Sequence, residues 1–79
     1  MRVTYEHKSG AAYIYLTPIE PSGVRHTLPV QDPDKLIEGT IILDIGHDGK
    51  LPGLEFLNAS QVLTGDVLNS ASKLGKAPR

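Results

Sequence analysis

The chain has 79 residues, a formal net charge of −1 and no cysteine. A chain this short forms one domain with a small core, and a sequence without cysteine excludes disulfides and thiolate metal sites. The acidic balance argues against nucleic acid as a partner. The first six residues are not an apolar secretory signal, and no stretch approaches about 20 apolar residues, so we expect a cytoplasmic protein without membrane contact.

The first two segments predict a β-hairpin. Residues 1–6 alternate apolar and polar side chains, residues 11–17 are rich in Tyr and Ile, and residues 7–10 make a turn. A loop of those four residues gives one continuous apolar face, and a slip by one residue would mix the two faces. The cross-strand pairs predicted are Val3–Ile14 and Tyr5–Ala12 on the apolar face, and Arg2–Tyr15 and Thr4–Tyr13 on the other.

A loop rich in Pro and Gly leads to a third strand. The alternation resumes over residues 24–30, where Pro29 has no N–H to donate and favours a sheet edge or a strand terminus. A polar turn at residues 31–35 follows. It leads into a short helical turn at residues 36–37, which Gly39 ends.

Asp48-Gly49 predicts a second hairpin. These residues stand between two apolar runs and tolerate the positive φ that a tight hairpin turn needs. Closing the chain there produces a second apolar face, and the opposite face is mixed. The predicted apolar face consists of Ile41, Leu43 and Ile45 opposite Phe56, Leu54 and Pro52.

After Leu57 the apolar period changes from 2 to about 3.6, which indicates helix. Asn58 or Ser60 can cap a short turn, and Thr64 can cap the helix that follows. We expect the apolar stripe of that helix to pack on the sheet, or else to exchange with a second chain. The stripe consists of Val67, Leu68, Ala71 and Leu74.

These elements predict a small α+β domain over residues 1–75. Its expected architecture is an antiparallel β-meander of about five strands, with the C-terminal helix packed on one face. Residues 76–79 are expected to form a frayed tail.

Asp44 and Glu55 are the candidate catalytic residues. The predicted register places them diagonally on one face of adjacent strands. Two carboxyl groups that lie close together acquire different pKa values, so that one can act as an acid and the other as a base. The alternative is structural, with Asp44 accepting hydrogen bonds from the turn backbone and Glu55 solvated or paired with a basic side chain. A hydrolase also needs a nucleophile and oxyanion donors, which the sequence does not assemble, so an enzyme is less favoured.

His7, His26 and His47 lack the spacing of metal ligands, so the sequence predicts neither a metal site nor a cofactor. Aromatic residues and arginine are typical interface anchors, and association would reinforce a marginal core. The sequence therefore favours a non-enzymatic module that forms a homodimer or binds another small protein. The candidate interface residues are Arg2, Tyr13, Tyr15 and Ile42.

Residues 5–16 read YEHKSGAAYIYL, and residues 42–60 read ILDIGHDGKLPGLEFLNAS. They resemble a family of short bacterial domains of unknown function with the pattern Y-D-x-x-x-D-A-x-Y-I-x-L followed by I-L-D-x-D-x-x-G-x-L-x-G-I-E-I-L-x-A-S. Glu6 and Gly10 stand where the family pattern has Asp. The resemblance implies no activity. Some members resemble the antidote half of small toxin–antidote pairs, which implies a protein-binding role.

Overall fold

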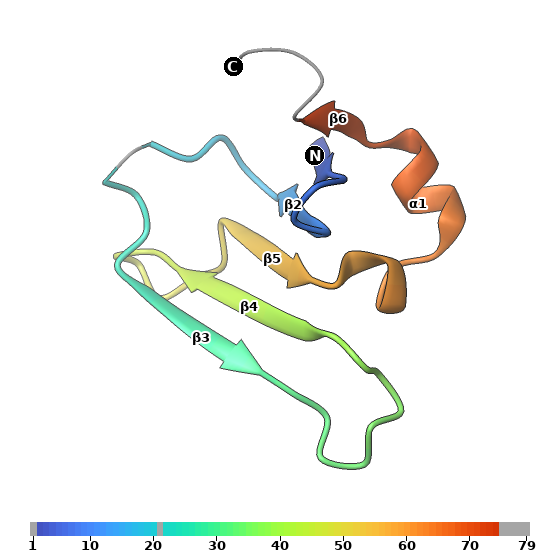
Figure 1. The fold of residues 1–79 in the computed structure, drawn as a ribbon. Coiled ribbons are helices and arrows are strands. Elements are labelled where there is room, and N and C mark those ends of the chain that lie inside the picture. The colour runs from blue at the N-terminus through green and yellow to red at the C-terminus, as the bar shows by residue number, and fades with distance from the viewer. Residues whose placement is uncertain (1, 21, 75–79) are drawn as a thin grey trace.

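The computed structural model describes residues 2–20 and 22–74. The tail expected at residues 76–79 lies outside the described residues, and so does Met1. Figure 1 shows strands followed by a 3₁₀ turn, a short helix and a last strand. In chain order the elements are β1 (Arg2–Glu6), β2 (Ala11–Tyr15), β3 (His26–Val30), β4 (Thr40–Ile45), β5 (Gly53–Leu57), η1 (Ala59–Gln61), α1 (Gly65–Ser70) and β6 (Ser72–Leu74).

The described strands form one sheet in the order β3-β4-β5-β2-β1-β6. The first five in this order pair antiparallel, which confirms a small antiparallel α+β fold, whereas β6 pairs parallel with β1. The meander order is wrong, because β2 pairs with β5 and not with β3. The reason is Pro29, which has no N–H to donate to a neighbouring strand. At the edge of the sheet, where β3 lies, this missing donor interrupts no hydrogen bonding between central strands.

Both hairpin registers are confirmed. All four predicted pairs of the first hairpin are present, and Ile41 and Leu43 lie opposite Phe56 and Leu54 in the second. The turn of the second hairpin differs from the expectation, because only Gly49 of the Asp-Gly pair has a positive φ, at 78°. Its N–H donates to the Gly46 carbonyl at 3.0 Å, which makes a turn one residue earlier than expected.

The core lies on one face of the sheet, over β1, β2 and β5. Ala12, Phe56 and Ala59 are buried there. The Ala59 N–H donates to the Gly10 carbonyl at 2.8 Å, so η1 is fixed to the turn of the first hairpin. Around these three the core includes the partly buried side chains of Tyr5, Ile14, Ile41, Leu54, Val62, Leu63 and Leu68.

The C-terminal helix is shorter than expected. Its predicted cap is confirmed, since the Thr64 hydroxyl accepts from the Val67 N–H at 3.4 Å. The helix ends at Ser70, whose hydroxyl donates to the Val67 carbonyl at 2.8 Å. The prediction that an apolar helical stripe continues to Leu74 is therefore wrong. Residues 72–74 form β6 instead, because pairing with β1 satisfies backbone groups at an open sheet edge. Before η1, the side chain of Asn58 makes no capping hydrogen bond.

The loop between β3 and β4 projects away from the sheet (Figure 1). The helical turn expected at residues 36–37 is wrong. The Asp32 carboxylate organises a turn there instead, accepting from the N–H groups of Asp34 at 2.9 Å and Leu36 at 3.0 Å. Lys35 has a φ of 57°, which is not helical, and the Leu36 side chain is 84% exposed.

Candidate functional site: the tyrosine face

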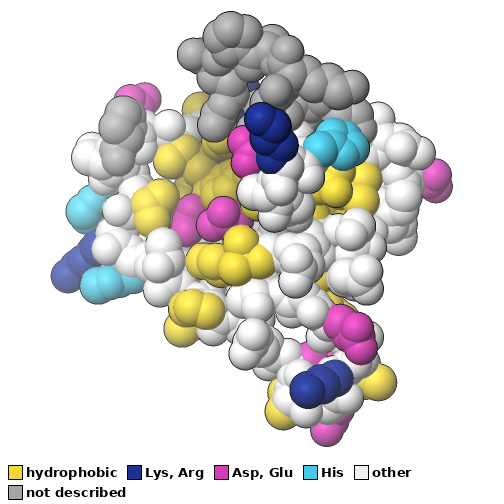
Figure 2. Space-filling view, in the orientation of Figure 1, with side chains coloured by type: hydrophobic (Ala, Val, Ile, Leu, Met, Phe, Trp, Pro, Cys, Tyr) yellow, Lys and Arg dark blue, Asp and Glu magenta, His cyan; other side chains and the backbone are white. Residues whose placement is uncertain are grey.

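Alternation along the strands divides the sheet into a core face and an opposite face, which we call the tyrosine face. Predicted site residues from four different strands lie on it. Figure 2 shows hydrophobic and acidic side chains next to each other near the middle of the molecule. The tyrosine face consists of Arg2, Thr4 and Glu6 on β1, Tyr13 and Tyr15 on β2, Gly53, Glu55 and Leu57 on β5, and Ile42 and Asp44 on β4.

Tyr13 reaches across β5 to β4. Its hydroxyl donates a hydrogen bond to the carboxylate of Asp44, 31 residues away in the chain. The path crosses Gly53, where an added Cβ would meet the Tyr13 ring and hydroxyl at 2.5 Å. Gly53 is therefore required because the Tyr13 ring occupies the space of its missing side chain.

The environment of Tyr13 disfavours its ionised form. Burial raises the pKa of the Tyr13 hydroxyl well above its ordinary value of 10.0, and the hydrogen bond to Asp44 raises it further. The nearby charges of Asp44, Tyr15 and Glu55 act in the same direction. The Tyr13 hydroxyl is thus a neutral donor to a buried carboxylate, since Asp44 is 9% exposed.

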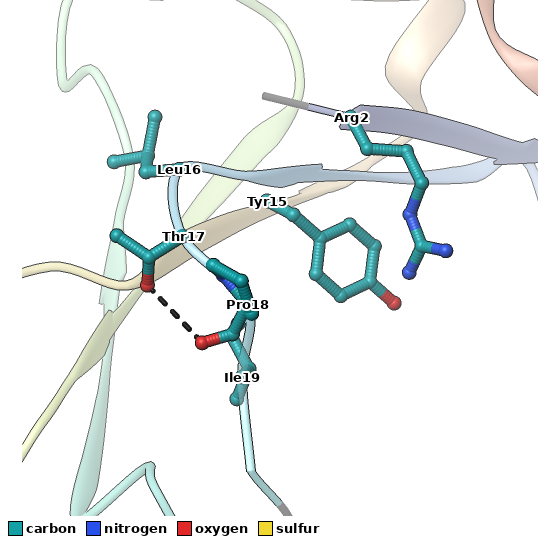
Figure 3. Close-up of a pocket in the computed structure, with 6 residues that line it drawn as sticks. All are labelled: Arg2, Tyr15, Leu16, Thr17, Pro18 and Ile19. Atoms are coloured by element: carbon teal, nitrogen blue, oxygen red, sulfur yellow. Dashed lines mark hydrogen bonds between the residues drawn. The ribbon is translucent and has the colours of Figure 1, made fainter.

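Tyr15 lies between Tyr13 and Arg2. The two tyrosine rings have centroids 4.6 Å apart and planes tilted by 53°, a separation at which aromatic rings attract each other. The Arg2 guanidinium lies over the Tyr15 ring, with Cζ 4.2 Å from its centroid. Figure 3 shows Tyr15 projecting between Arg2 and Pro18 in a pocket of about 440 Å³, which we call the arginine pocket.

A second pocket, of about 420 Å³, opens beside the same tyrosines, and we call it the acidic pocket. Glu6 and Glu55 bring two carboxylates to its lining, and Leu57 supplies apolar surface. Sequence analysis did not select Glu6 as a site residue. The available signal was its spacing, since a residue two positions after Thr4 on β1 lies on the same sheet face.

Asp44 and Glu55 lie as the register predicts, because Asp44 pairs with Gly53 and Glu55 pairs with Ile42. They are diagonal neighbours, and both influence Tyr13. The structural alternative named the wrong partner for Asp44, whose carboxylate accepts from the Tyr13 hydroxyl. Tyr15 contacts both Arg2 and Tyr13, whereas Ile42 is half-buried on β4.

Metal-ligating residues do not converge within residues 2–20 and 22–74, where no group of three or more His, Asp or Glu could hold a metal ion. His47 instead contacts the Ser22 carbonyl through Nε2 at 3.0 Å, and the His7 ring contacts the Tyr5 ring with centroids 4.6 Å apart and planes tilted by 58°. In that same part of the chain, no helix is long and apolar enough to cross a membrane.

Residues 2–60 match the model of a family described as protein of unknown function (DUF2283). The chain belongs to this family. The DUF2283 match spans β1 to β5, so it includes every residue of the tyrosine face and ends before α1. The predicted resemblance to a small domain of unknown function is thereby confirmed. No curated protein and no solved structure matches the chain.

Proposed function

We propose that this DUF2283 protein is a non-enzymatic interaction module whose tyrosine face binds a second protein chain, either another small protein or a second copy. The observation that carries this proposal is the contact series from Arg2 through Tyr15 and Tyr13 to Asp44. It orders two aromatic rings and a guanidinium on one surface. Aromatic residues and arginine are the side chains most enriched among interface anchors.

The thickness of the molecule supports this role. Its shortest dimension is 19 Å, which suits a sheet with one further layer at a spacing of about 10 Å. Ala59 and Leu68 supply that layer from η1 and α1 on the core face. Ala59 of η1 lies in the buried cluster on the core face, which supports the opposite, tyrosine face as the side that binds a partner.

Pre-organisation supports it too. A tyrosine fixed before binding loses little conformational freedom on association, so more of its contact energy appears as affinity. Tyr13 is fixed by Asp44, and Tyr15 is fixed between Tyr13 and Arg2. A protein of the antidote type, which acts by covering another small protein, would use such a surface.

A hydrolase or small-ligand site at Asp44 and Glu55 is the second candidate. The observation that favours it is that both carboxylates lie near the same tyrosine. Asp44 is less suited to act as a base because its carboxylate already accepts the Tyr13 hydroxyl. A screen of ester, phosphoester and glycoside substrates with the protein and its Asp44→Ala variant tests this candidate, which fails if activity is absent or unchanged.

Association is measured by sedimentation velocity over a wide concentration range and by co-purification from the native host. We expect self-association or capture of a defined partner, and we expect Tyr15→Asp to abolish it by placing a charge in the aromatic contact. Gln61→Asp is the matched control, since it adds the same charge at an exposed residue of η1. A protein that stays monomeric and captures no partner, or equal behaviour of the two variants, would contradict the proposal.

A further inference from the structure

We propose that the acidic pocket binds the guanidinium group of an arginine side chain supplied by a partner protein. This inference rests on the proposed function, because it names the chemistry of the partner that meets the tyrosine face. The lining of the pocket includes two tyrosines, Tyr13 and Tyr15, and two acidic residues, Glu6 and Glu55.

The pocket combines the two features that recognise an organic cation. Aromatic ring faces attract a cation through their quadrupole, most strongly where water is partly excluded. Carboxylates add charge and accept hydrogen bonds. Among side chains that the structure describes, no lysine or arginine lines this pocket, so Glu6 and Glu55 have no basic neighbour in its lining.

The chain itself shows that one ring of this pair, that of Tyr15, accepts a guanidinium. Tyr15 lines both the arginine pocket and the acidic pocket. In the arginine pocket, Arg2 lies over the Tyr15 ring at 4.2 Å, within the range of a cation–π contact (Figure 3). The acidic pocket offers the neighbouring ring of Tyr13 together with two carboxylates, and is therefore the better site for a second guanidinium.

Arginine fits this pocket better than lysine. A guanidinium is planar, stacks on aromatic rings, is more weakly hydrated than an ammonium and can donate to two carboxylates at once. The negative charge belongs to Glu6 and Glu55, because the Tyr13 hydroxyl keeps its proton and is engaged with Asp44.

The surroundings of the pocket favour a protein as the source of the guanidinium. Leu57 lines the pocket and is 40% exposed, and Ile42 lies opposite Glu55 on the neighbouring strand. These apolar side chains offer contact area to the residues that flank an arginine in a polypeptide, which a free diamine or polyamine would leave unused.

Binding is tested by titrating ¹⁵N-labelled protein with N-acetyl-arginine amide, its lysine counterpart and its uncharged citrulline counterpart. We expect arginine to shift the amide signals of Thr4, Glu6 and Glu55 most, lysine less and citrulline least. Glu55→Gln should weaken arginine binding roughly tenfold, as loss of a charge-assisted contact predicts. Glu38→Gln, which removes the same charge from the loop before β4, should leave binding unchanged. Equal binding of arginine and citrulline, or equal effects of the two variants, would overturn the inference.

A second titration identifies the source of the cation. It compares a twelve-residue peptide carrying two arginines with spermine, and we expect the peptide to bind more tightly through the apolar residues beside the pocket. Tighter binding of spermine would overturn the assignment of the cation to a protein. If the protein self-associates and Glu55→Gln abolishes that association, the arginine comes from a second copy of this chain and not from a different protein.

The two proposals fail in different ways. If Tyr15→Asp abolishes association but arginine amide does not bind, the arginine inference fails and the interaction module stands. If arginine amide binds at the acidic pocket while Tyr15→Asp leaves association unchanged, the tyrosine face is not the interface, and the assignment to a partner protein fails with it.

Discussion

The two faces of the sheet are built from alternate residues of the same strands, yet they are held together differently. On the core face, apolar side chains such as Phe56 and Ala12 form a buried cluster with Ala59 of η1. On the tyrosine face, order comes from specific pairs, Tyr13 with Asp44 and Tyr15 with Arg2. Hydrophobic burial is non-directional and tolerates many partners, whereas a hydrogen bond and a stacked cation fix the positions of particular atoms. One face therefore stabilises the fold, while the other presents a defined surface.

The largest expected effect separates the two faces within β5. Phe56→Ala should lower the free energy of unfolding by about 3–5 kcal/mol, since it removes a buried ring from the core. Leu57→Ala, at the next residue but on the tyrosine face, should cost under about 1 kcal/mol because Leu57 is 40% exposed. Urea unfolding followed by circular dichroism measures both. Similar losses in the two variants would show that the tyrosine face carries as much stability as the core.

A smaller effect is expected where the Tyr13 ring crosses β5. Gly53→Ala places a methyl group where the ring lies, so it should displace Tyr13, break its bond to Asp44 and cost about 2–3 kcal/mol. Gly65→Ala is the matched control, because a Cβ there meets nothing within 4 Å. The same unfolding measurement applies. If both variants unfold alike, the close approach of Tyr13 to Gly53 does not matter to stability.

The smallest effect concerns the proton of Tyr13. Because folding raises the pKa of this hydroxyl above 10.0, the unfolded chain releases the proton first and stability should fall as pH rises above about 10. Tyr13→Phe should lower the free energy of unfolding by about 1–2 kcal/mol at neutral pH, because it leaves Asp44 without its hydrogen-bond donor. The stability of this variant should also fall less steeply than that of the unmodified protein above pH 10. Unfolding at pH 8 and pH 11, with tyrosinate absorbance at 295 nm, measures both. An unchanged alkaline decline in Tyr13→Phe would contradict the raised pKa of Tyr13.

Much of the candidate site was predictable because strand alternation is a local property. Tyr13, Tyr15 and Arg2 share a face as soon as the four-residue turn fixes the first register, and Asp44 and Glu55 share a face of the second hairpin once its register is fixed. Pairing of β2 with β5 then places the two sets on the same side of the sheet. The function of these residues was not predictable in the same way, because shared placement on a face does not say which atoms meet.

The sequence by itself determined the two hairpins, their registers and the separation of apolar from mixed faces. These follow from period-2 alternation and from turn residues, which act within a few residues. Tertiary structure alone decided that β2 pairs with β5, that residues 72–74 extend the sheet as β6, and that Tyr13 crosses Gly53 to reach Asp44. Each of these joins segments distant in the chain, where the outcome depends on which sheet edge is free and which space is empty.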